Sequence, residues 1–339
     1  MAGYNIAIDL GTGMITVFVA GRGIVYKEAN AATIDKNTGE IVAIGNSAFE
    51  MLGRTPDTLE CVLPIQSGVI SRFNIMSSVT EQIITKICKN SIFKPNVIVN
   101  TPVGLTMPEK RTLISMISSG CAGRVSLIET PIACALGTGI EINSPHGVMV
   151  VDIGAGTTDI SVITMQTPAY FKTLRFGGND LNEAICQYIK KERGYDIGLH
   201  TAEKIKCTVG CAQLPEEELE LTVAGKEHIT GIPLLFSVTS SEIFKALRDS
   251  VKLIATGILD ILEESLPELY SDICTDGIIL AGGGAKLRGL DSALTDMLKM
   301  PVKLSADSEN CAAKGAGYAL RNIKQYEDLG FIFRMREEI

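Results

Sequence analysis

The run Ile6-Ala7-Ile8-Asp9-Leu10-Gly11-Thr12-Gly13 has a second copy in the same chain, Met149-Val150-Val151-Asp152-Ile153-Gly154-Ala155-Gly156. Both copies read apolar run, aspartate, apolar residue, glycine, small residue, glycine, and a β-branched segment follows each. The two aspartates are 143 residues apart (152 − 9), close to half of the 339 residues. A match of this length with an aspartate at the same place predicts two related halves, each built on a β-hairpin with an acidic residue at its turn.

Strand and helix patterns alternate along the rest of the chain. Apolar residues at helical spacing predict helices at 75–90, 108–120, 180–193 and 239–264. Apolar runs predict strands at 97–99, 125–128 and 277–280, and Gly21-Arg22-Gly23 predicts a hairpin turn. This alternation favours an α/β fold with helices on the faces of the sheets. The first glycine turn leads into a strand, whereas a Rossmann fingerprint or a P-loop would lead into a helix.

Composition excludes several classes of protein. Hydrophobic residues make up 46% and charged residues 21%, which is too apolar for a disordered chain. The net charge of −8 argues against a general nucleic-acid partner. Nine cysteines without framework spacing indicate reduced thiols, and the sequence shows no signal peptide and no apolar run long enough to span a membrane. We therefore expect a cytoplasmic protein.

Three glycine turns, at 11–13, 154–156 and 282–284, end apolar strands. Glycine lets backbone N–H groups approach phosphate oxygens, and hydroxyl donors stand in the first two turns, at Thr12, Thr157 and Thr158. Asp9 and Asp152 would repel a polyphosphate unless a cation lay between them. They therefore predict a Mg²⁺ ion held mainly through its waters and ligated directly by the phosphates.

These residues resemble a known superfamily. The segments 9–13, 152–158 and 280–284 are similar to the phosphate-1, phosphate-2 and adenosine motifs of actin, sugar kinases and heat-shock chaperones. Further stretches resemble the bacterial MreB family in particular, and the resemblance runs from about residue 4 to about residue 322. They are Met51-Leu52-Gly53-Arg54-Thr55-Pro56, residues 64–70, Thr101-Pro102-Val103-Gly104, residues 175–180, residues 202–206 and residues 282–290.

The resemblance implies an actin-like (ribonuclease H-like) α/β fold, in which duplicated domains flank a nucleotide cleft and each carries a smaller subdomain. We expect the first domain at 1–30, 73–140 and 308–339, with its subdomain at 31–72. The second domain is expected at 141–180 and 236–307, with its subdomain at 181–235.

The resemblance also implies a function and a site. The function is that of an ATP-dependent, membrane-associated filament protein that organises cell-wall elongation and maintains rod shape. Its implied partners are further copies of itself, the inner membrane surface, and shape-determining membrane proteins of cell-wall elongation. The cofactors are ATP and Mg²⁺, with phosphate contacts from Gly11, Thr12, Gly13, Met14, Gly154, Ala155, Gly156, Thr157, Thr158, Gly177 and Gly178. Ribose and adenine contacts would come from Glu203, Lys206, Gly282, Gly283, Gly284 and Ala285.

Two departures from the family pattern concern the chemistry. The family usually carries Glu-Glu-Pro after a Leu-Ile strand, and its second glutamate is taken to position the attacking water. Here the run is Leu127-Ile128-Glu129-Thr130-Pro131, so Thr130 replaces that glutamate while Glu129 remains. We expect slow ATP hydrolysis, with Thr157, Thr130 and Glu129 as the candidate catalytic residues. Met14 stands where the family usually has asparagine, which removes a polar phosphate contact.

Membrane association is expected at one loop. The family binds the inner membrane through an N-terminal amphipathic helix, which is absent here, or through a small apolar loop. Ile92 and Phe93 lie between Lys89 and Lys94, a pattern suited to shallow insertion into an anionic surface. The alternative is that Ile92 and Phe93 cap the core between a helix and a strand.

Other functions remain open from the sequence. A small-molecule kinase of the same superfamily would need an acceptor-site motif, and none is visible. A chaperone ATPase would need a β-rich substrate domain, for which the chain leaves no room. A paralogue that binds nucleotide without cycling is kept open by Thr130.

Overall fold

The computed structural model describes residues 4–89, 91–118, 122–321, 323, 326, 332 and 333. The chain divides into two compact units. Unit 1 comprises Met1–His146, Ile163–Phe171 and Glu309–Ile339, and unit 2 comprises Gly147–Val162 and Lys172–Ser308. The four-part domain division given above stays a prediction, and its segment 308–339 lies partly outside the described residues.

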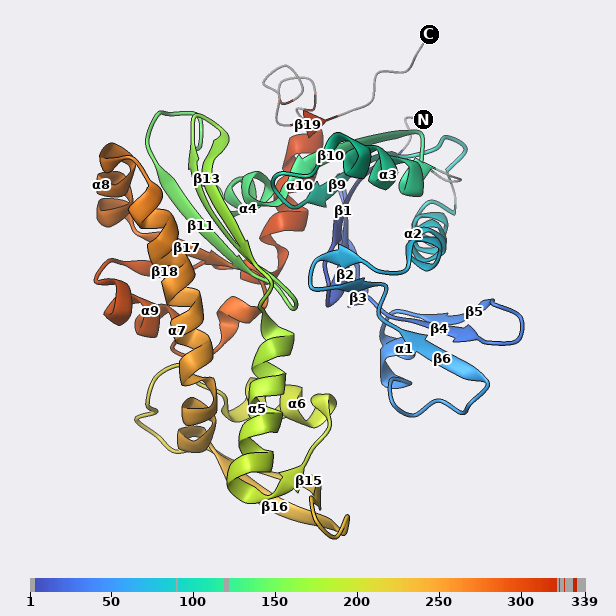
Figure 1. The fold of residues 1–339 in the computed structure, drawn as a ribbon. Coiled ribbons are helices and arrows are strands. Elements are labelled where there is room, and N and C mark those ends of the chain that lie inside the picture. The colour runs from blue at the N-terminus through green and yellow to red at the C-terminus, as the bar shows by residue number, and fades with distance from the viewer. Residues whose placement is uncertain are drawn as a thin grey trace. The chain divides into compact units, whose positions relative to one another are not determined.

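Unit 1 is built on a six-stranded sheet in the order β19-β10-β9-β1-β2-β3 (Figure 1). β1 (Asn5–Leu10), β2 (Met14–Val19) and β3 (Gly23–Ala29) form an antiparallel meander. On the other side, β1 pairs parallel with β9 (Asn96–Thr101), and β9 pairs parallel with β10 (Arg124–Glu129). β19 (Ile332–Phe333) pairs antiparallel with β10. The predicted first hairpin and the strands predicted at 97–99 and 125–128 are therefore confirmed.

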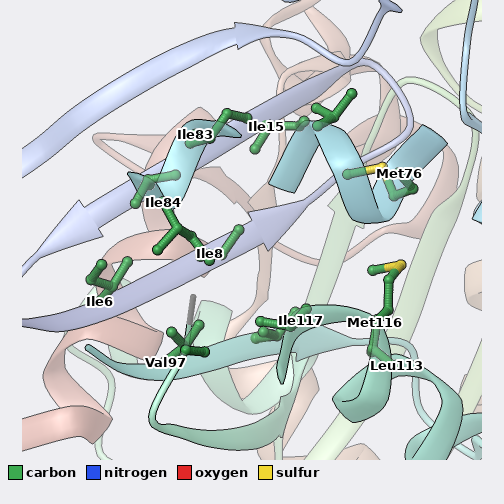
Figure 2. Close-up of a cluster of buried hydrophobic side chains, with 14 of the residues drawn as sticks. Ile6, Ile8, Ile15, Met76, Ile83, Ile84, Val97, Leu113, Met116 and Ile117 are labelled. Atoms are coloured by element: carbon green, nitrogen blue, oxygen red, sulfur yellow. The ribbon is translucent and has the colours of Figure 1, made fainter. Parts of the chain in front are cut away.

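Helices cover both faces of this sheet. Because side chains alternate along a strand, Ile6 and Ile8 of β1 point to one face and Ala7 to the other. Ile6 and Ile8 join a buried cluster with α2 (Phe73–Ile87) and α3 (Met107–Ser118), and Figure 2 shows part of this cluster. On the opposite face α10 (Cys311–Arg321) packs on β1 and on α4 (Thr130–Thr138). Parallel strands β1, β9 and β10 therefore end together at one edge of a sheet that is covered on both sides.

A smaller sheet in unit 1 is made by the segment after β3. It has the order β5-β4-β6 and is joined by a short helix and a two-stranded ribbon. Their bounds are β4 (Ala32–Asp35), β5 (Ile41–Ile44), α1 (Asn46–Glu50), β6 (Leu59–Val62), β7 (Ile65–Gln66) and β8 (Val69–Ile70).

A second large sheet has the order β13-β12-β11-β17-β18 and belongs to unit 2 except for its segment Ile163–Phe171, which is counted with unit 1. Its strands are β11 (Val148–Ile153), β12 (Thr158–Thr164), β13 (Thr167–Leu174), β17 (Ile278–Ala281) and β18 (Val302–Leu304). β11 pairs parallel with β17, and Asp152 stands opposite Ala281 at the end of both strands. The second predicted aspartate therefore occupies the same place in its sheet as Asp9 does in β1.

The helices of unit 2 follow the predicted pattern with small shifts at their ends. α7 (Ser240–Glu264) begins with a capping box, in which Thr239 Oγ1 accepts from Glu242 N and Glu242 accepts from Thr239 N. α5 (Gly178–Arg193) and α6 (Leu199–Val209) pack with α7 against a three-stranded sheet, in a second buried cluster. That sheet has the order β14-β15-β16, from β14 (Tyr195–Asp196), β15 (Glu220–Glu227) and β16 (Pro233–Thr239). α8 (Pro267–Asp276) and α9 (Leu290–Leu298) complete the helices of this unit (Figure 1).

Within the part of the chain that the structure describes, no helix combines the length and the apolar character needed to cross a bilayer.

Candidate functional site

Hydrogen bonds within the protein hold the first glycine turn, Gly11–Gly13, in place. Gly11 N donates to Met14 O at 3.0 Å, which closes the turn between β1 and β2. Asn30 reaches the same turn twice, since its Nδ2 donates to Gly11 O and its backbone N donates to Gly13 O, both at 2.9 Å. Thr12 Oγ1 accepts from Gly68 N at 3.0 Å. The turn is thus fixed before any ligand arrives, as a phosphate-binding turn requires.

Asp9 lies at the end of β1, beside Asn100 of the neighbouring strand β9. Burial raises the pKa of Asp9 to about 6, while the Asn100 side chain and the Lys27 ammonium oppose that rise. The Asn100 amide is 94% buried, and neither its nitrogen nor its oxygen makes a hydrogen bond of normal geometry. Asn30 Oδ1 is also buried without a partner. Orphaned polar atoms around a carboxylate suit ordered waters, so these residues fit a hydrated cation.

The raised pKa gives a prediction for the protein without metal and nucleotide. The folded state binds the Asp9 proton more tightly than the unfolded chain does. Protonation therefore stabilises the fold fully below the unfolded pKa of 3.8, and this stabilisation is lost as the pH rises through about 6. Asp9→Asn stays neutral, and we expect it to be more stable than the unmodified chain by up to about 3 kcal/mol at pH 8, since the pKa rises from 3.8 to about 6. The difference should vanish below about pH 3, where Asp9 is protonated in both states. Thermal unfolding in EDTA across this range measures it, and an equal difference at both ends would contradict the assignment to Asp9.

The second glycine turn repeats the first hydrogen bond at the same offset of 143 residues. Gly154 N donates to Thr157 O at 2.8 Å, as Gly11 N does to Met14 O. The two threonines after this turn differ in their surroundings. Thr158 is fully buried and its hydroxyl donates to Phe176 O at 2.9 Å, so this hydroxyl supports the turn from inside. Thr157 Oγ1 lies 3.5 Å from Asp159 Oδ2 and is the hydroxyl of this pair that is partly exposed.

Asp159 follows these threonines on β12. Burial raises the pKa of its carboxyl group, and hydrogen bonds from Thr173 and Thr157 oppose the rise. The carboxylate thus joins β12 to β13 beside the turn.

The first turn of α5 packs against the second glycine turn. Gly178 N donates to Gly154 O at 3.0 Å and Asn179 N donates to Ala155 O at 2.7 Å. Gly177 N donates to Asp180 Oδ2 at 2.7 Å. A Cβ at Gly177 would lie 2.7 Å from Gly154 O, a contact that only glycine avoids. The N–H groups of Gly177 and Gly178 are therefore already used within the protein, and the two glycines hold the turn instead of donating outward.

The third glycine turn packs on the end of β11. Gly282 has a φ of +83°, and a Cβ there would lie 2.4 Å from Asp152 Oδ1. Its backbone N donates to Ser308 O at 2.8 Å. Gly283 leads into the 3₁₀ turn Gly284–Lys286, in which Ala285 is buried. This glycine segment and Asp152 thus lie side by side at one edge of the sheet.

Glu203 and Lys206, predicted at the ribose and adenine, form an ion pair on α6. Lys206 Nζ lies 2.8 Å from Glu203 Oε2 and also donates to Gly178 O at 2.8 Å. Asn182 Nδ2 of α5 donates to the same Glu203 oxygen at 2.6 Å. The pair is therefore hydrogen-bonded to α5 and is not an isolated ion pair on a solvated helix face.

Thr130 and Glu129 lie where β10 passes into α4, at the edge of the sheet that also carries Asp9. The hydroxyl of Thr130 donates to Thr101 O at 3.0 Å. Burial raises the pKa of Glu129, and the Lys110 charge opposes the rise. Thr130 therefore lies at the expected end of the sheet, but its hydroxyl proton is directed to a backbone carbonyl.

The predicted membrane loop joins α2 to β9. Ile92 is 89% exposed and Phe93 is 57% exposed, while Ser91 Oγ donates to Phe93 O at 2.7 Å. Neither side chain caps the core of unit 1, so the structural alternative for this pair is wrong.

Three asparagines of the site were missed at the level of sequence: Asn30, Asn100 and Asn182. Each is buried, and each has at least one side-chain atom without a partner. Of the three, Asn100 has a sequence pattern that could have identified it, because it is the polar residue directly after the apolar run Val97-Ile98-Val99. No cluster of three or more His, Cys, Asp or Glu side chains that could hold a metal occurs among the described residues. A cation here would need ligands from a bound phosphate and from water.

Known proteins resemble this chain over nearly its whole length. The family model described as MreB/Mbl protein matches residues 3–328. The chain is 37% identical over 320 residues to the cell shape-determining protein Mbl of Bacillus subtilis, covering 94% of this chain and 96% of the relative. It is also 37% identical over 328 residues to the cell shape-determining protein MreB of Escherichia coli, covering 95% of this chain and 94% of the relative.

Solved structures agree with these relatives. The crystal structure of MreB 5 of Spiroplasma citri bound to AMPPNP has a TM-score of 0.92 and 30% identity, covering 97% of this chain and 99% of that chain. The same protein bound to ADP also has a TM-score of 0.92, with 29% identity over 96% of this chain and 99% of that chain. The MamK double helical filament has a TM-score of 0.79 at 21% identity, covering 95% of this chain and 99% of that chain, and supports the fold alone.

The predicted actin-like α/β fold is thereby confirmed. Because both the family model and the relatives cover nearly the whole length, the chain belongs to the MreB/Mbl family.

Proposed function

We propose that this chain is an ATP-binding, actin-like filament protein that acts at the inner face of the cell membrane, organises cell-wall elongation and maintains rod shape. The observation that carries the proposal is the whole-chain match to the MreB/Mbl family, together with the paired glycine turns. Its relatives in Bacillus subtilis and Escherichia coli are cell shape-determining proteins. The family resemblance supports self-association into filaments and contact with shape-determining membrane proteins.

ATP is the proposed nucleotide because the similar Spiroplasma citri protein binds AMPPNP and ADP. We assign its phosphates to the turns at 11–14 and 154–157, with Thr158, Gly177 and Gly178 supporting the second turn from within. Its ribose and adenine are assigned to Glu203, Lys206 and the segment 282–285. Each assignment uses residues that the structure holds in a fixed local arrangement.

Mg²⁺ would be held between the phosphates and Asp9 and Asp152, mainly through its waters, and would neutralise phosphate charge. The buried amide of Asn100 beside Asp9 adds a polar group for one of those waters.

The first test is pelleting of the purified protein with and without Mg-ATP, with phosphate release followed in the same tubes. We expect pelleting that depends on nucleotide and releases little phosphate, because Thr130 replaces the family glutamate. If the protein does not pellet with any nucleotide, with or without lipid, the filament proposal is wrong. Phosphorylation of a sugar panel would then favour a kinase, whereas binding without pelleting or turnover would favour a paralogue that does not cycle.

Membrane binding is proposed at the loop that carries Ile92 and Phe93. Burying two such side chains in a bilayer interface contributes about 1.5–3 kcal/mol each. We expect the double change to serine to abolish co-sedimentation with anionic liposomes while leaving the melting temperature unchanged, because both side chains are exposed. As a matched control, the exposed Ile229 changed to serine should leave co-sedimentation intact. Unchanged binding of the double variant would rule out this loop.

A further inference from the structure

We infer that a cavity between β3 and the last turn of α2 binds the phosphate headgroup of an anionic lipid. The cavity belongs to unit 1 and has a volume of about 310 Å³, at the lower end of the range of ligand pockets. The nucleotide assignment uses none of the residues that line it. They include Arg22, Tyr26, Lys27, Glu28, Lys86 and Ile87.

β3 leaves one side of this cavity open. Among the strands that the structure describes, β3 pairs with β2 alone and ends the six-stranded sheet. The register shifts between Val17 and Phe18 of β2, which leaves Val25 of β3 as an extra residue in a β-bulge. A bulge twists an edge strand and blunts it against pairing with another strand. This edge therefore suits a small ligand better than an added strand.

Two of the four charged side chains at the cavity are engaged within the protein. Lys27 Nζ lies 2.6 Å from Glu309 Oε2. Glu28 Oε2 accepts from Asn46 N at 3.3 Å, which directs its carboxylate toward the start of α1. The other two, Arg22 and Lys86, are exposed and form no ion pair with another described residue. The cavity thus carries two uncompensated cations in a chain whose net charge is −8.

A phosphate group with an apolar neighbour matches this lining. The guanidinium of Arg22 presents parallel N–H donors that fit two phosphate oxygens, and the ammonium of Lys86 adds a second positive charge. Val25 and Ile87 line the same cavity and are partly buried against the core of unit 1. A lipid headgroup offers both parts, since its phosphate is joined to a glycerol that carries acyl chains.

The position of the cavity identifies a bilayer as the source of the phosphate. The turn that carries Arg22 lies at the start of β1, because Ala20 N donates to Asn5 O at 3.0 Å. Asn5 stands opposite Asn96, the first residue of β9, which directly follows the exposed apolar loop. The last turn of α2 leads into the same loop. If that loop inserts into an anionic surface, as the proposed function states, this edge of the sheet faces the headgroups.

Titration of the full chain with short-chain phosphatidylglycerol, below the concentration at which it forms micelles, tests the cavity apart from a bilayer. We expect binding that weakens at least roughly tenfold in the double variant Arg22→Gln/Lys86→Gln, which loses both charge-assisted contacts. Lys36→Gln/Arg54→Gln is the matched control, because it removes two positive charges from exposed positions of the segment after β3. It should bind the lipid as the unmodified chain does.

The competing explanations give different results. No binding by the unmodified chain, or an equal loss in the control variant, overturns the inference, because charge alone would then explain any attraction. Glycerol phosphate that binds as tightly as the short-chain lipid overturns the assignment to a lipid.

The loop proposal and this inference can fail separately. The Ile92 and Phe93 double change to serine should leave this titration unchanged, whereas it should abolish co-sedimentation with liposomes. Failure of the liposome assay therefore removes the loop and leaves the cavity to be decided by the titration. Thermal unfolding of each variant checks that it folds, which the exposure of Arg22 and Lys86 leads us to expect.

Discussion

Replacing Thr130 by glutamate is expected to raise the rate of phosphate release from ATP by about tenfold or more. Phosphoryl transfer to water depends on positioning the water and accepting its proton, and a threonine hydroxyl is a poor acceptor. In this chain the hydroxyl also donates to Thr101 O, which holds the side chain against β9. A carboxylate at the same place would supply the acceptor that the family resemblance leads us to expect there.

The change should be tolerated by the fold. Thr130 is the first residue of α4, where a negative charge interacts favourably with the helix dipole. Phosphate release during pelleting with Mg-ATP measures the effect. Glu129→Gln is the neighbouring control and should change turnover little, because adjacent side chains at this junction point in different directions.

Two results would contradict this account. An unmodified chain that already turns over as fast as Thr130→Glu would show that Thr130 does not limit hydrolysis. If that turnover were lost in Thr157→Ala but kept in Glu129→Ala, another group on the second phosphate turn would have taken over the role of the glutamate. Asp159, whose Oδ2 lies 3.5 Å from the Thr157 hydroxyl, is one carboxylate beside that turn.

The duplicated hairpins could be predicted because their signal is local and repeated. An aspartate, two glycines and a following β-branched strand are readable from neighbouring residues, and the structure closes both turns with the same hydrogen bond 143 residues apart. The alternation of strands and helices was equally readable, because each element shows its own apolar period.

What could not be predicted is which side chains meet across distant segments. Asn182 and Glu203 are 21 residues apart on two helices, and nothing in either helix alone indicates their hydrogen bond. The buried hydroxyl of Thr158 looks like that of Thr157 in the sequence, and only the position of Phe176 separates their roles. Sequence thus identifies the turns of this site, whereas the supports of those turns depend on packing.

Gly315→Ala is expected to destabilise the protein by more than about 3 kcal/mol. In most helices this change stabilises, by up to about 1 kcal/mol, since alanine is the better helix former. Here a Cβ at Gly315 would lie 1.7 Å from Ala133 O and 2.7 Å from Gly137 N. Both neighbours are backbone atoms, so no side-chain rotation relieves the clash, and α10 would have to move away from α4.

The facing helix is packed equally closely, because a Cβ at Gly137 of α4 would lie 1.9 Å from Cys311 O of α10. Since α10 also packs on β1, its displacement would loosen the strand that carries Asp9. Urea unfolding of the full chain measures the loss. Gly198→Ala is the matched control, because its φ is −82° and no atom lies within 4 Å of the added carbon. Because Gly198 is the N-cap of α6, its replacement by alanine should cost no more than about 1 kcal/mol. A Gly315→Ala protein as stable as this control would mean that α4 and α10 do not meet backbone to backbone.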